Sequence, residues 1–349
     1  MPASGRPGER GRAAHAAPPP GRALVLGLTA LLGTLAVVSL TIGPAPIGPA
    51  TALKALFAEH GSASLIVREI RLPRTLLALG IGGTLGLTGA ALQGLLRNPL
   101  ADPAVFGAPQ AAALGAVLAL YFGWAGALSA ALPVAAIAGA LLSIVVVVGV
   151  AGRDGSTVTL VLAGLAVGSL AGAATSLAIS LSPNPFAVTE IVFWLLGSLE
   201  DRSMRHVLLA FPFLAVAAVI LGRTGRALRA LSLGEDAARS LGVAVGRTRA
   251  LVVVAAAIGA GAAVAVAGAI GFVGLVAPHL VRSFAGHDPA RTLLPSALAG
   301  AALLLAADIA VRLIPSAVEV KIGVLTAFLG VPVFLWVVAR RQAGFAEPP

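Results

Sequence analysis

The chain has 349 residues, of which 58% are hydrophobic and only 11% are charged. Soluble domains carry roughly 25% charged residues, so this composition excludes an ordinary soluble fold and indicates an all-α polytopic membrane protein. There is no cysteine, which excludes disulfides and thiolate metal sites. The net charge of +10 comes from arginines scattered between apolar segments, a pattern that favours cytoplasmic retention over nucleic-acid binding.

The first 22 residues contain several arginines and a proline run at 18–20, and we expect them to form a flexible cytoplasmic tail. Residues 23–43 follow as a stretch of roughly 20 apolar residues, enough to cross about 30 Å of hydrocarbon as a helix. The apolar core of a signal peptide is shorter, roughly 7–15 residues. The segment is therefore predicted to be a retained first span.

Nine further apolar segments are predicted to be spans. They lie at about 74–95, 104–123, 129–151, 158–181, 206–222, 250–270, 271–285, 293–313 and 322–339. Ten spans would place both termini on one side, and counting arginine and lysine in the loops puts that side in the cytoplasm. The sequence thus predicts one transmembrane domain over 23–340 and a second cytoplasmic tail at 341–349.

Two helices outside this set are too short to span. Residues 51–59 are expected to form a short amphipathic helix outside the membrane. Residues 187–199 follow the Pro183-Asn184-Pro185 breaker and are expected to lie at the outer mouth as a re-entrant or interfacial helix. A plain interfacial anchor and a gating role remain open for this second helix.

The loop at 223–249 is the main charged interruption, with six arginines. Its inner piece, SLGEDAARSLGV, is predicted to be a short helix in which Ser232 caps the N-terminus and Glu235 reaches back to it. A charged helix on the cytoplasmic face of a membrane protein is typical of a partner-binding element. We expect a separate motor protein to bind this loop and to transmit force to it.

Catalytic and ion-coupling motifs are missing from the sequence. The two lysines follow no phosphate-binding glycine run, and the five histidines have no ligand spacing, so no catalytic residues and no metal site are expected. Asp308 precedes Arg312 by one helical turn, which favours an ion pair over a proton relay. The scarcity of ionisable groups within spans argues against an ion-driven transporter.

The second span carries a face of small residues at Gly82, Gly86 and Gly89 that favours close helix packing. Gln93, also within this span, is expected to line the path or, more simply, to bond a neighbouring helix. Asn98-Pro99 is predicted to end the span, and Gly107 permits a tight start to the next.

Arginines also gather where the second span begins. Arg71 and Arg74 flank Pro73 at the expected outer rim, with Arg68 and Arg312 as possible neighbours. Such arginines either snorkel to the interface or form a positive patch that receives an acidic partner.

Six stretches now resemble the permease subunits of binding-protein-dependent ABC importers for iron-siderophores, haem and cobalamin. They are RLPRTLLALGIGGTLGLTGAALQGLLRNPLADPAVFG at 71–107, LAGLAVGSL at 162–170, LSLGEDAARSLGV at 231–243, GAIGFVGLVAPHLVRSFAGHDPARTLLP at 268–295, AADIAVRLI at 306–314 and GVLTAFLGVPVFLWVV at 323–338. One departure is Lys321, which stands where the family usually has proline.

The resemblance implies a cobalamin-permease-like fold of ten helices that dimerises, as a homodimer or heterodimer, around a translocation path. It implies an ABC ATPase that binds ATP and magnesium on the cytoplasmic side, so that this chain is no enzyme and binds no cofactor itself. The coupling positions would be Gly234, Glu235, Ala238, Leu241 and Gly242, beside Ser232. An extracytoplasmic solute-binding protein would dock through Arg71, Arg74 and Arg312.

Ferric siderophore is the cargo we expect from this resemblance, with cobalamin or haem as alternatives. A secondary transporter working alone in the lipid of the cell membrane is a different class of function. It leaves the charged cytoplasmic helix unexplained.

Overall fold

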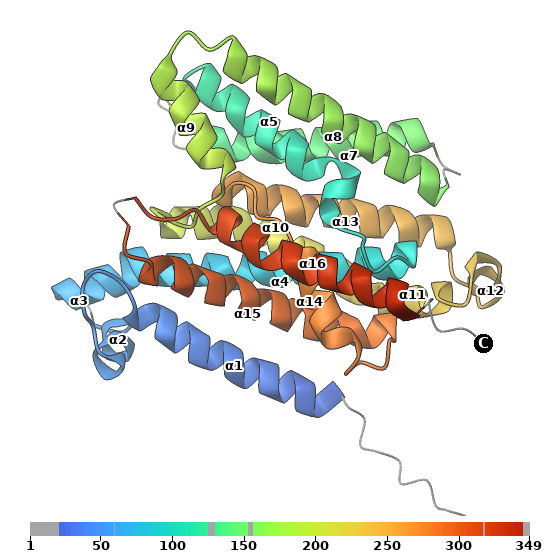
Figure 1. Ribbon diagram of the computed structural model, residues 1–349, viewed down its shortest axis with the longest axis horizontal. Helices are drawn as coiled ribbons and strands as arrows, with labels where there is room; N and C mark the ends of the chain where they lie inside the picture. The colour runs from blue at the N-terminus through green and yellow to red at the C-terminus, as the bar shows by residue number, and fades with distance from the viewer. Residues whose placement is uncertain (1–20, 59, 125–129, 153–155, 317, 345–349) are drawn as a thin grey trace, which may run out of the picture.

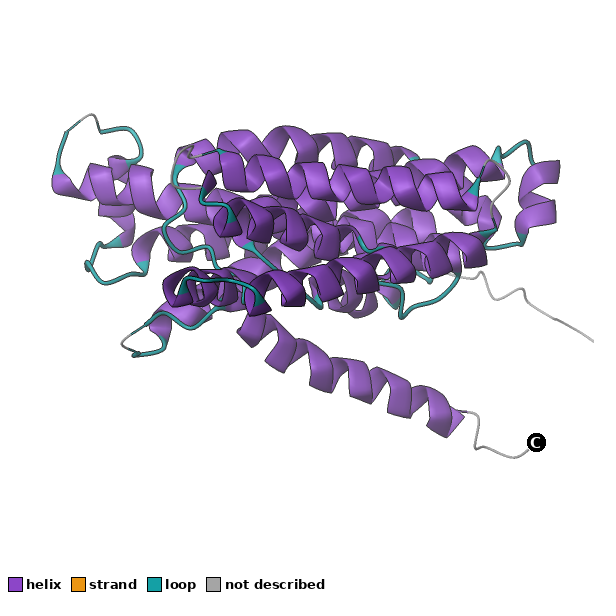
Figure 2. Ribbon diagram, turned by 90° about the horizontal axis from the view of Figure 1, so that it is seen from above, coloured by secondary structure: helices purple, strands orange, loops and turns teal. Residues whose placement is uncertain are grey.

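The computed structural model describes residues 21–58, 60–124, 130–152, 156–316 and 318–344. Within these residues the protein is helical and contains no strand (Figure 2). The helices of the first half are α1 (Gly21–Thr41), α2 (Pro49–Ala55), α3 (Ser62–Leu65), η1 (Ile66–Arg71), α4 (Leu72–Leu96), η2 (Pro103–Phe106), α5 (Ala108–Tyr121), α7 (Ala131–Ala151) and α8 (Thr157–Ser180). Those of the second half are α9 (Pro185–Leu195), α10 (Met204–Arg223), α11 (Gly225–Leu231), α12 (Glu235–Ser240), α13 (Val245–Ala267), α14 (Val273–Arg282), α15 (Pro289–Leu313) and α16 (Ile322–Gly344).

The centre of the bundle is α4, which packs against α15, α14, α10 and α13 (Figure 1). A second layer of α5, α7, α8 and α9 lies beyond α13, which contacts both layers. The first helix, α1, lies at the opposite edge of the bundle and packs on α15. Because α4 and α13 are apolar and buried on nearly every side, they lack the single apolar stripe of a surface helix.

Seven helices among the described residues are long and apolar enough to cross a membrane. They contain the expected spans at 23–43, 74–95, 129–151, 158–181, 206–222, 250–270 and 293–313, with ends that differ by a few residues. The span expected at 74–95 is part of one helical run, Ser62–Leu96, that includes the π-helical turn η1. The segments expected at 104–123 and 271–285 form only the shorter helices α5 and α14. The segment expected at 322–339 lies in α16, which is not one of the seven.

Two irregular segments explain why α5 and α14 are short. Arg97 adopts a left-handed conformation that ends α4, so that the chain turns back through residues 98–107 before α5 begins. Gly107, with a φ of 71°, lies so close to α8 that an added Cβ would sit 2.5 Å from the carbonyl oxygen of Gly164. Residues 268–272 interrupt the chain between α13 and α14 in the same way. Such irregular backbone is tolerated at membrane depth where protein covers it.

The long helices run between two ends of the molecule (Figure 1). The α2 end carries α2, α3 and the loop between α15 and α16, and the α12 end carries α11 and α12. The first residue of α1 and the last turn of α16 both lie toward the α12 end. The expected tails at 1–22 and 341–349 lie mostly outside the described residues.

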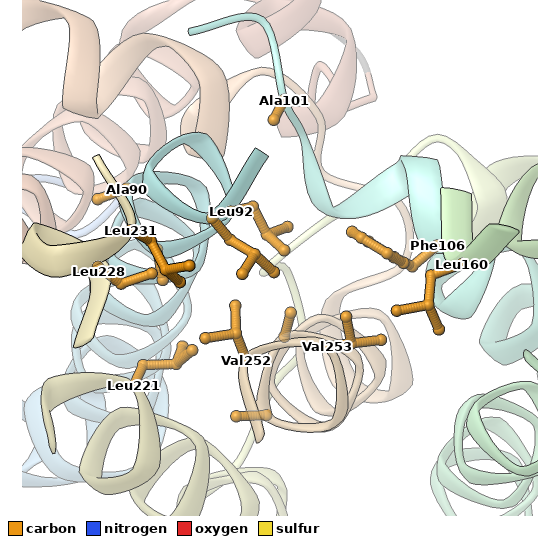
Figure 3. Close-up of a cluster of buried hydrophobic side chains, with 14 of the residues drawn as sticks. Ala90, Leu92, Ala101, Phe106, Leu160, Leu221, Leu228, Leu231, Val252 and Val253 are labelled. Carbon is orange, nitrogen blue, oxygen red and sulfur yellow. The ribbon is translucent and has the colours of Figure 1, made fainter. Parts of the chain in front are cut away.

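A buried apolar cluster lies behind α12. Figure 3 shows Leu228 and Leu231 of α11 facing Leu92 of α4, with Val252 and Val253 of α13 beside them. These side chains are almost fully inaccessible to solvent. The cluster gives the charged loop at 223–249 a firm apolar base on α4 and α13.

Candidate functional sites at the two ends of the molecule

The arginines expected at the outer rim meet at the α2 end in one network, here called the arginine cluster (Arg71, Arg74 and Arg312 with Asp308 and Glu319). The Nε of Arg74 donates to Oδ1 of Asp308 over 2.7 Å, and its two terminal nitrogens bind both oxygens of Glu319. Arg312 donates from Nη2 to Oδ2 of Asp308 over 2.6 Å. Asp308 is 0% exposed and therefore bridges two cations inside the protein.

Arg71 is held differently from the other two arginines. Its guanidinium donates to the carbonyl oxygens of Leu40 and Thr41, each at 2.8 Å, and to that of Ala45. These acceptors lie at the end of α1 and in the loop that follows it. No carboxylate among the described residues pairs with Arg71. Three cations against two carboxylates leave the arginine cluster with a net charge of +1.

A cavity of about 420 Å³ opens beside the arginine cluster. Its wall carries all three arginines and Glu319, and its remaining lining is mostly apolar. The cavity thus combines an apolar wall, a net positive charge and one carboxylate. An acidic side chain entering it would meet cations whose positions are already fixed by the protein.

The rim patch expected from the sequence has a different structure. Arg71 and Arg74 are buried, so the alternative of snorkelling to the interface is wrong for these two. Arg68 is exposed and donates to the carbonyl of Ala58 at 3.3 Å, outside the arginine cluster. The predicted pair of Asp308 with Arg312 is confirmed, although sequence spacing gave no sign that Asp308 also binds Arg74.

Lys321, the departure from the family pattern, is paired at the α2 end. Its Nζ lies 2.8 Å from Oε2 of Glu200 and 5.8 Å from the centre of the Phe193 ring. Glu200 follows α9 and Lys321 directly precedes α16. The lysine therefore joins the loop after α9 to the entry of the last helix, and its charge is neutralised there. Helix α9 itself begins at Pro185, two residues before the expected start at 187.

The charged loop at the α12 end folds into two short helices. Ser232 closes α11, and its hydroxyl donates to the carbonyl of Arg229 at 2.6 Å. The expected capping box between Ser232 and Glu235 is therefore wrong. Gly234 is the N-cap of α12, with a φ of 109° and no capping side chain. Only glycine adopts this conformation readily, so only three residues separate α11 from α12.

Helix α12 presents two faces. Ala238 is buried against the bundle, whereas Leu233 and Leu241 on either side are well exposed. Gly242, with a φ of 80°, ends the helix in a Schellman arrangement, because Gly242 N–H bonds the carbonyl of Arg239 and Val243 N–H bonds that of Ala238. The exposed leucines can receive a partner while Ala238 anchors the helix.

Glu235 faces the bundle as well as solvent. Its Oε1 binds Nη2 of Arg249 at 2.6 Å and its Oε2 binds Nη2 of Arg239 at 3.2 Å. Arg249 lies near the start of α13 and is 10% exposed at the side chain, against 37% for Glu235. The residue expected to contact an ATPase thus has a buried partner within its own chain.

The remaining predicted residues lie along α4. A Cβ added at Gly82 or Gly86 would meet backbone of α15 at 2.4 or 2.1 Å, and one added at Gly89 would meet the Gly274 carbonyl of α14 at 1.7 Å. Gln93 is buried and bonds α14, donating to the Leu275 carbonyl at 3.4 Å and accepting from Arg282. Gln93 thus forms the bond to a neighbouring helix that was the simpler of its two expected roles.

The turn after α4 places Asn98 and Pro99 just beyond the end of the helix. Helix α4 ends at Leu96, two residues before Asn98, because Arg97 adopts the left-handed conformation. The side-chain oxygen of Asn98 accepts from the N–H of Leu100 at 3.0 Å, which stabilises the turn. Pro99 lines a cavity of about 270 Å³ at the α12 end.

Several residues that complete these sites were not identified from the sequence: Ser39, whose carbonyl and hydroxyl oxygens accept from Arg312, and Glu200, Arg249 and, as a partner of Arg74, Glu319. Each is a polar or charged residue next to an apolar stretch, which is the available signal. The partners of Ser39, Glu200 and Glu319 are more than 100 residues away in the chain, so pairing them needs the fold. Among the described residues, no group of three or more His, Asp or Glu side chains could hold a metal ion.

The chain matches known proteins over most of its length. Residues 31–340 match the FecCD transport family. The chain is 40% identical over 286 residues to YvrB of Bacillus subtilis, an uncharacterized ABC transporter permease protein, with 80% of each chain covered. It is 39% identical over 322 residues to the vitamin B12 import system permease protein BtuC of Klebsiella pneumoniae, covering 92% of this chain and 95% of that one.

Two further similarities extend these findings. The cobalamin import system permease protein BtuC of Halobacterium salinarum is 39% identical over 289 residues, with 82% of this chain and 76% of the relative covered. A solved structure of an ABC transporter, described as metal-chelate type and inward-facing, superposes with a TM-score of 0.82 at 32% identity. That superposition covers 91% of this chain and 99% of the other.

Proposed function

The chain belongs to the FecCD transport family, and we propose that it carries a metal chelate through the cell membrane, driven by a separate ATPase. It is a permease of the ABC importer type and a multi-pass membrane protein. The observation that carries the proposal is the placement of two different sites at opposite ends of one bundle. A cationic cavity lies at the α2 end and an exposed short helix at the α12 end (Figure 1).

In this proposal the α12 end faces the cytoplasm and binds the ATPase. The positive-inside pattern of the loop at 223–249 supports this orientation. Leu233 and Leu241 are large apolar side chains left exposed beside α12, which suits insertion into a groove of a partner. Ten spans and cytoplasmic termini, with a second permease subunit beside this one, complete the proposed assembly.

The ATPase contact is tested by replacing Leu241 with Asp. Charge at an exposed apolar contact should weaken co-purification of the ATPase by about tenfold or more, since desolvated anchors dominate such interfaces. Leu53→Asp, an exposed leucine of α2 at the other end, is the matched control and should leave co-purification unchanged. Equal co-purification of wild type and Leu241→Asp would contradict the contact.

At the α2 end the cavity is proposed to receive an acidic side chain of the solute-binding protein. Within the described part of the chain Arg71 has only neutral acceptors, so it can gain a carboxylate at no loss of an ion pair seen there. Arg74 already binds Glu319, so a second incoming carboxylate would compete with Glu319. Docking is thus proposed to exchange an internal partner for an external one.

This exchange predicts opposite effects of two neutral variants. Glu319→Gln removes the internal competitor and should tighten docking severalfold, whereas Arg71→Gln should weaken it about tenfold, in a salt-sensitive way. Arg68→Gln, outside the arginine cluster, is the control. The affinity of the binding protein for the permease in lipid nanodiscs is the measurement. Weaker docking of Glu319→Gln would overturn the competition.

Three cargo candidates remain within the metal chelates. Ferric siderophore is the cargo expected from the sequence. Cobalamin is favoured by two relatives named as cobalamin or vitamin B12 import permeases, those of Halobacterium salinarum and Klebsiella pneumoniae. Haem is the remaining alternative.

The whole proposal is tested with the permease, its ATPase and its binding protein in proteoliposomes. Uptake of radiolabelled cobalamin and of a ferric siderophore is measured side by side, with and without ATP. ATP-dependent uptake of one of them is expected. Uptake that persists when the ATPase is left out would contradict the importer and indicate a secondary transporter.

A further inference from the structure

Helix α12 is too short to be stable alone. Isolated helices of fewer than about 12 residues are marginal in water, so the six residues of α12 depend on contacts with the bundle. Three contacts fix it: the burial of Ala238, the glycine turns at Gly234 and Gly242, and the carboxylate of Glu235. The first two set its place, and the third is the charged connection to another helix.

The two partners of Glu235 are not equivalent. Arg239 lies on α12 itself and is 58% exposed, so this i,i+4 pair stays within the short helix. Arg249 lies on α13, is nearly buried and binds Glu235 over 2.6 Å. A charged hydrogen bond in a partly desolvated site is stronger and less screened than one in water. The bond to Arg249 is therefore the firm connection between α12 and α13.

Helix α13 extends this connection across the protein. Its 23 residues give it a length of about 35 Å, and most of its side chains are buried, so it can move only together with its neighbours. The first turns of α13, which include Arg249, lie toward the α12 end, and the helix runs from there toward the α2 end (Figure 1).

At its far end α13 touches backbone directly. A Cβ added at Gly268 would lie 2.2 Å from the Trp194 carbonyl of α9, and one at Gly323 would lie 2.5 Å from the Ala269 carbonyl. The N–H of Ser198 donates to the carbonyl of Ala267 at 2.8 Å. A shift of α13 is thus passed to the loop after α9 and to the first turn of α16, with no side chain to absorb it.

We propose that the Glu235–Arg249 ion pair is the link through which α12 moves α13 during transport. Both residues are positioning residues for transport, and Glu235 acts inside the permease and not as an ATPase contact. This inference rests on the proposed function, because it takes α12 to be the element on which the ATPase acts.

The test is a charge-reversal cycle in the complete importer. Glu235→Arg and Arg249→Glu are made singly and together, and the complex with ATPase and binding protein is reconstituted in proteoliposomes. Each single variant should co-purify with the ATPase within about twofold of wild type but lower ATP-driven uptake by about tenfold or more, because one charge loses its buried partner. The double variant should recover uptake to within about threefold of wild type.

Asp236→Asn, which removes one exposed charge without introducing a new one, is the matched control. Asp236 is on the same helix, its side chain is 99% exposed, and among the described residues it forms an ion pair only with Arg239 of that helix. It should leave uptake and the number of ATP molecules hydrolysed per cargo unchanged. In the two single variants this number should rise, because ATP hydrolysis continues while transport fails. A purely structural role would not change that ratio.

A second cycle covers the case in which a charge-reversed variant does not fold. Glu235→Gln, Arg249→Gln and their combination keep the side-chain volumes nearly unchanged. The double glutamine variant should transport no worse than the poorer of the two single variants. The link is contradicted if the uptake losses of the two single glutamine variants multiply in the double variant. It is also contradicted if the double charge reversal transports no better than its single variants, or if Glu235→Gln loses ATPase binding.

The outcomes separate this inference from the proposed function. If the wild-type complex shows no ATP-driven uptake, the proposed function fails. If the wild type transports and the reversal is not rescued, only the Glu235–Arg249 link fails.

Discussion

The arginines at the two ends of the molecule are held in different ways. At the α2 end Arg71 and Arg74 are buried. Arg71 donates to backbone carbonyls at the end of α1, and Arg74 donates to the carboxylates of Asp308 and Glu319. At the α12 end Arg229 and Arg239 are more than half exposed and pair with carboxylates of that end, and Arg249, bound to Glu235, is the nearly buried exception. Buried cations need permanent partners, whereas exposed cations are screened and exchange partners freely. The α2 end is thus built to keep its geometry, and the α12 end to tolerate contact.

The largest effect is expected from Asp308→Ala, which breaks the network of the α2 end at its centre. The change leaves Arg74 and Arg312 without their shared buried carboxylate, and removal of one partner of a buried pair costs about 3–5 kcal/mol. Thermal unfolding of the permease in detergent measures the loss. Asp236→Ala, at an exposed aspartate, is the control. If Asp308→Ala and Asp236→Ala lowered the unfolding temperature by the same small amount, buried and exposed carboxylates would not differ in their contribution to stability.

A smaller effect is expected at the α12 end from Asp288→Ala. Asp288 caps α15 by accepting from the N–H of Ala290 at 2.9 Å, and loss of such a cap costs about 1 kcal/mol. Asp288→Asn should cost less, since asparagine also caps, and this pair of variants separates the cap from the ion pair with Arg229. Thermal unfolding of the three proteins is again the measurement. A larger loss for Asn than for Ala would contradict the cap.

The same residue predicts a pH dependence. Burial of the carboxyl acts to raise the pKa of Asp288, but hydrogen bonds from Arg229 and Ala290 outweigh it and hold the pKa below its ordinary value. A depressed pKa in the folded state means that the stabilisation is present above the unfolded value of about 4 and is lost as the pH falls through the folded value. The difference in unfolding midpoint between wild type and Asp288→Asn should therefore shrink in that acidic range. A difference that grows on acidification would contradict the shift.

Lys321→Ala tests whether the ion pair of Lys321 with Glu200 at the α2 end is held as firmly as the buried pairs of the arginine cluster. Glu200, the partner of Lys321, is about one-third exposed, so the loss should be about 1 kcal/mol or less and should decrease at high salt. A loss comparable to that of Asp308→Ala would show that the rim and the arginine cluster act as one network.

Arg239→Ala should have the smallest effect. Its pairs with Glu235 and Asp236 are exposed helix pairs worth about 0.5 kcal/mol each or less. Transport should also remain close to wild type, because the bond from Glu235 to Arg249 is untouched. If Arg239→Ala reduced uptake as strongly as Arg249→Glu, Arg239 and not Arg249 would be the partner through which Glu235 acts.

The sequence predicted the helical character and the positions of most long helices, because each depends on local apolar length. It also predicted the ion pair of Asp308 with Arg312, four residues apart. It failed at α12, where the S-x-x-E pattern suggested a cap at Ser232 although the neighbouring Gly234 makes the turn. The backbone conformation of Gly234 places the start of α12 after Gly234 and not after Ser232.

The partners of Arg74 were beyond reach for a different reason. Asp308 and Glu319 are 234 and 245 residues away in the chain, and only the packing of α4 on α15 brings them to it. The rim position of the arginines followed from counting charges, but their burial depends on α1 and the loop before α16. Long-range packing of this kind leaves no periodic trace in the sequence.

The peripheral helix α1 also matters for the order of assembly during synthesis. The carbonyls of Leu40 and Ser39 at its end accept from Arg71 and from Arg312, residues made about 30 and about 270 positions later. Until α15 has entered the membrane, α1 lacks the helix on which it packs and Arg312 is absent. Closure of the network on α1 therefore coincides with insertion of one of the last helices, and a subunit truncated before Arg312 exposes an incomplete site to quality control.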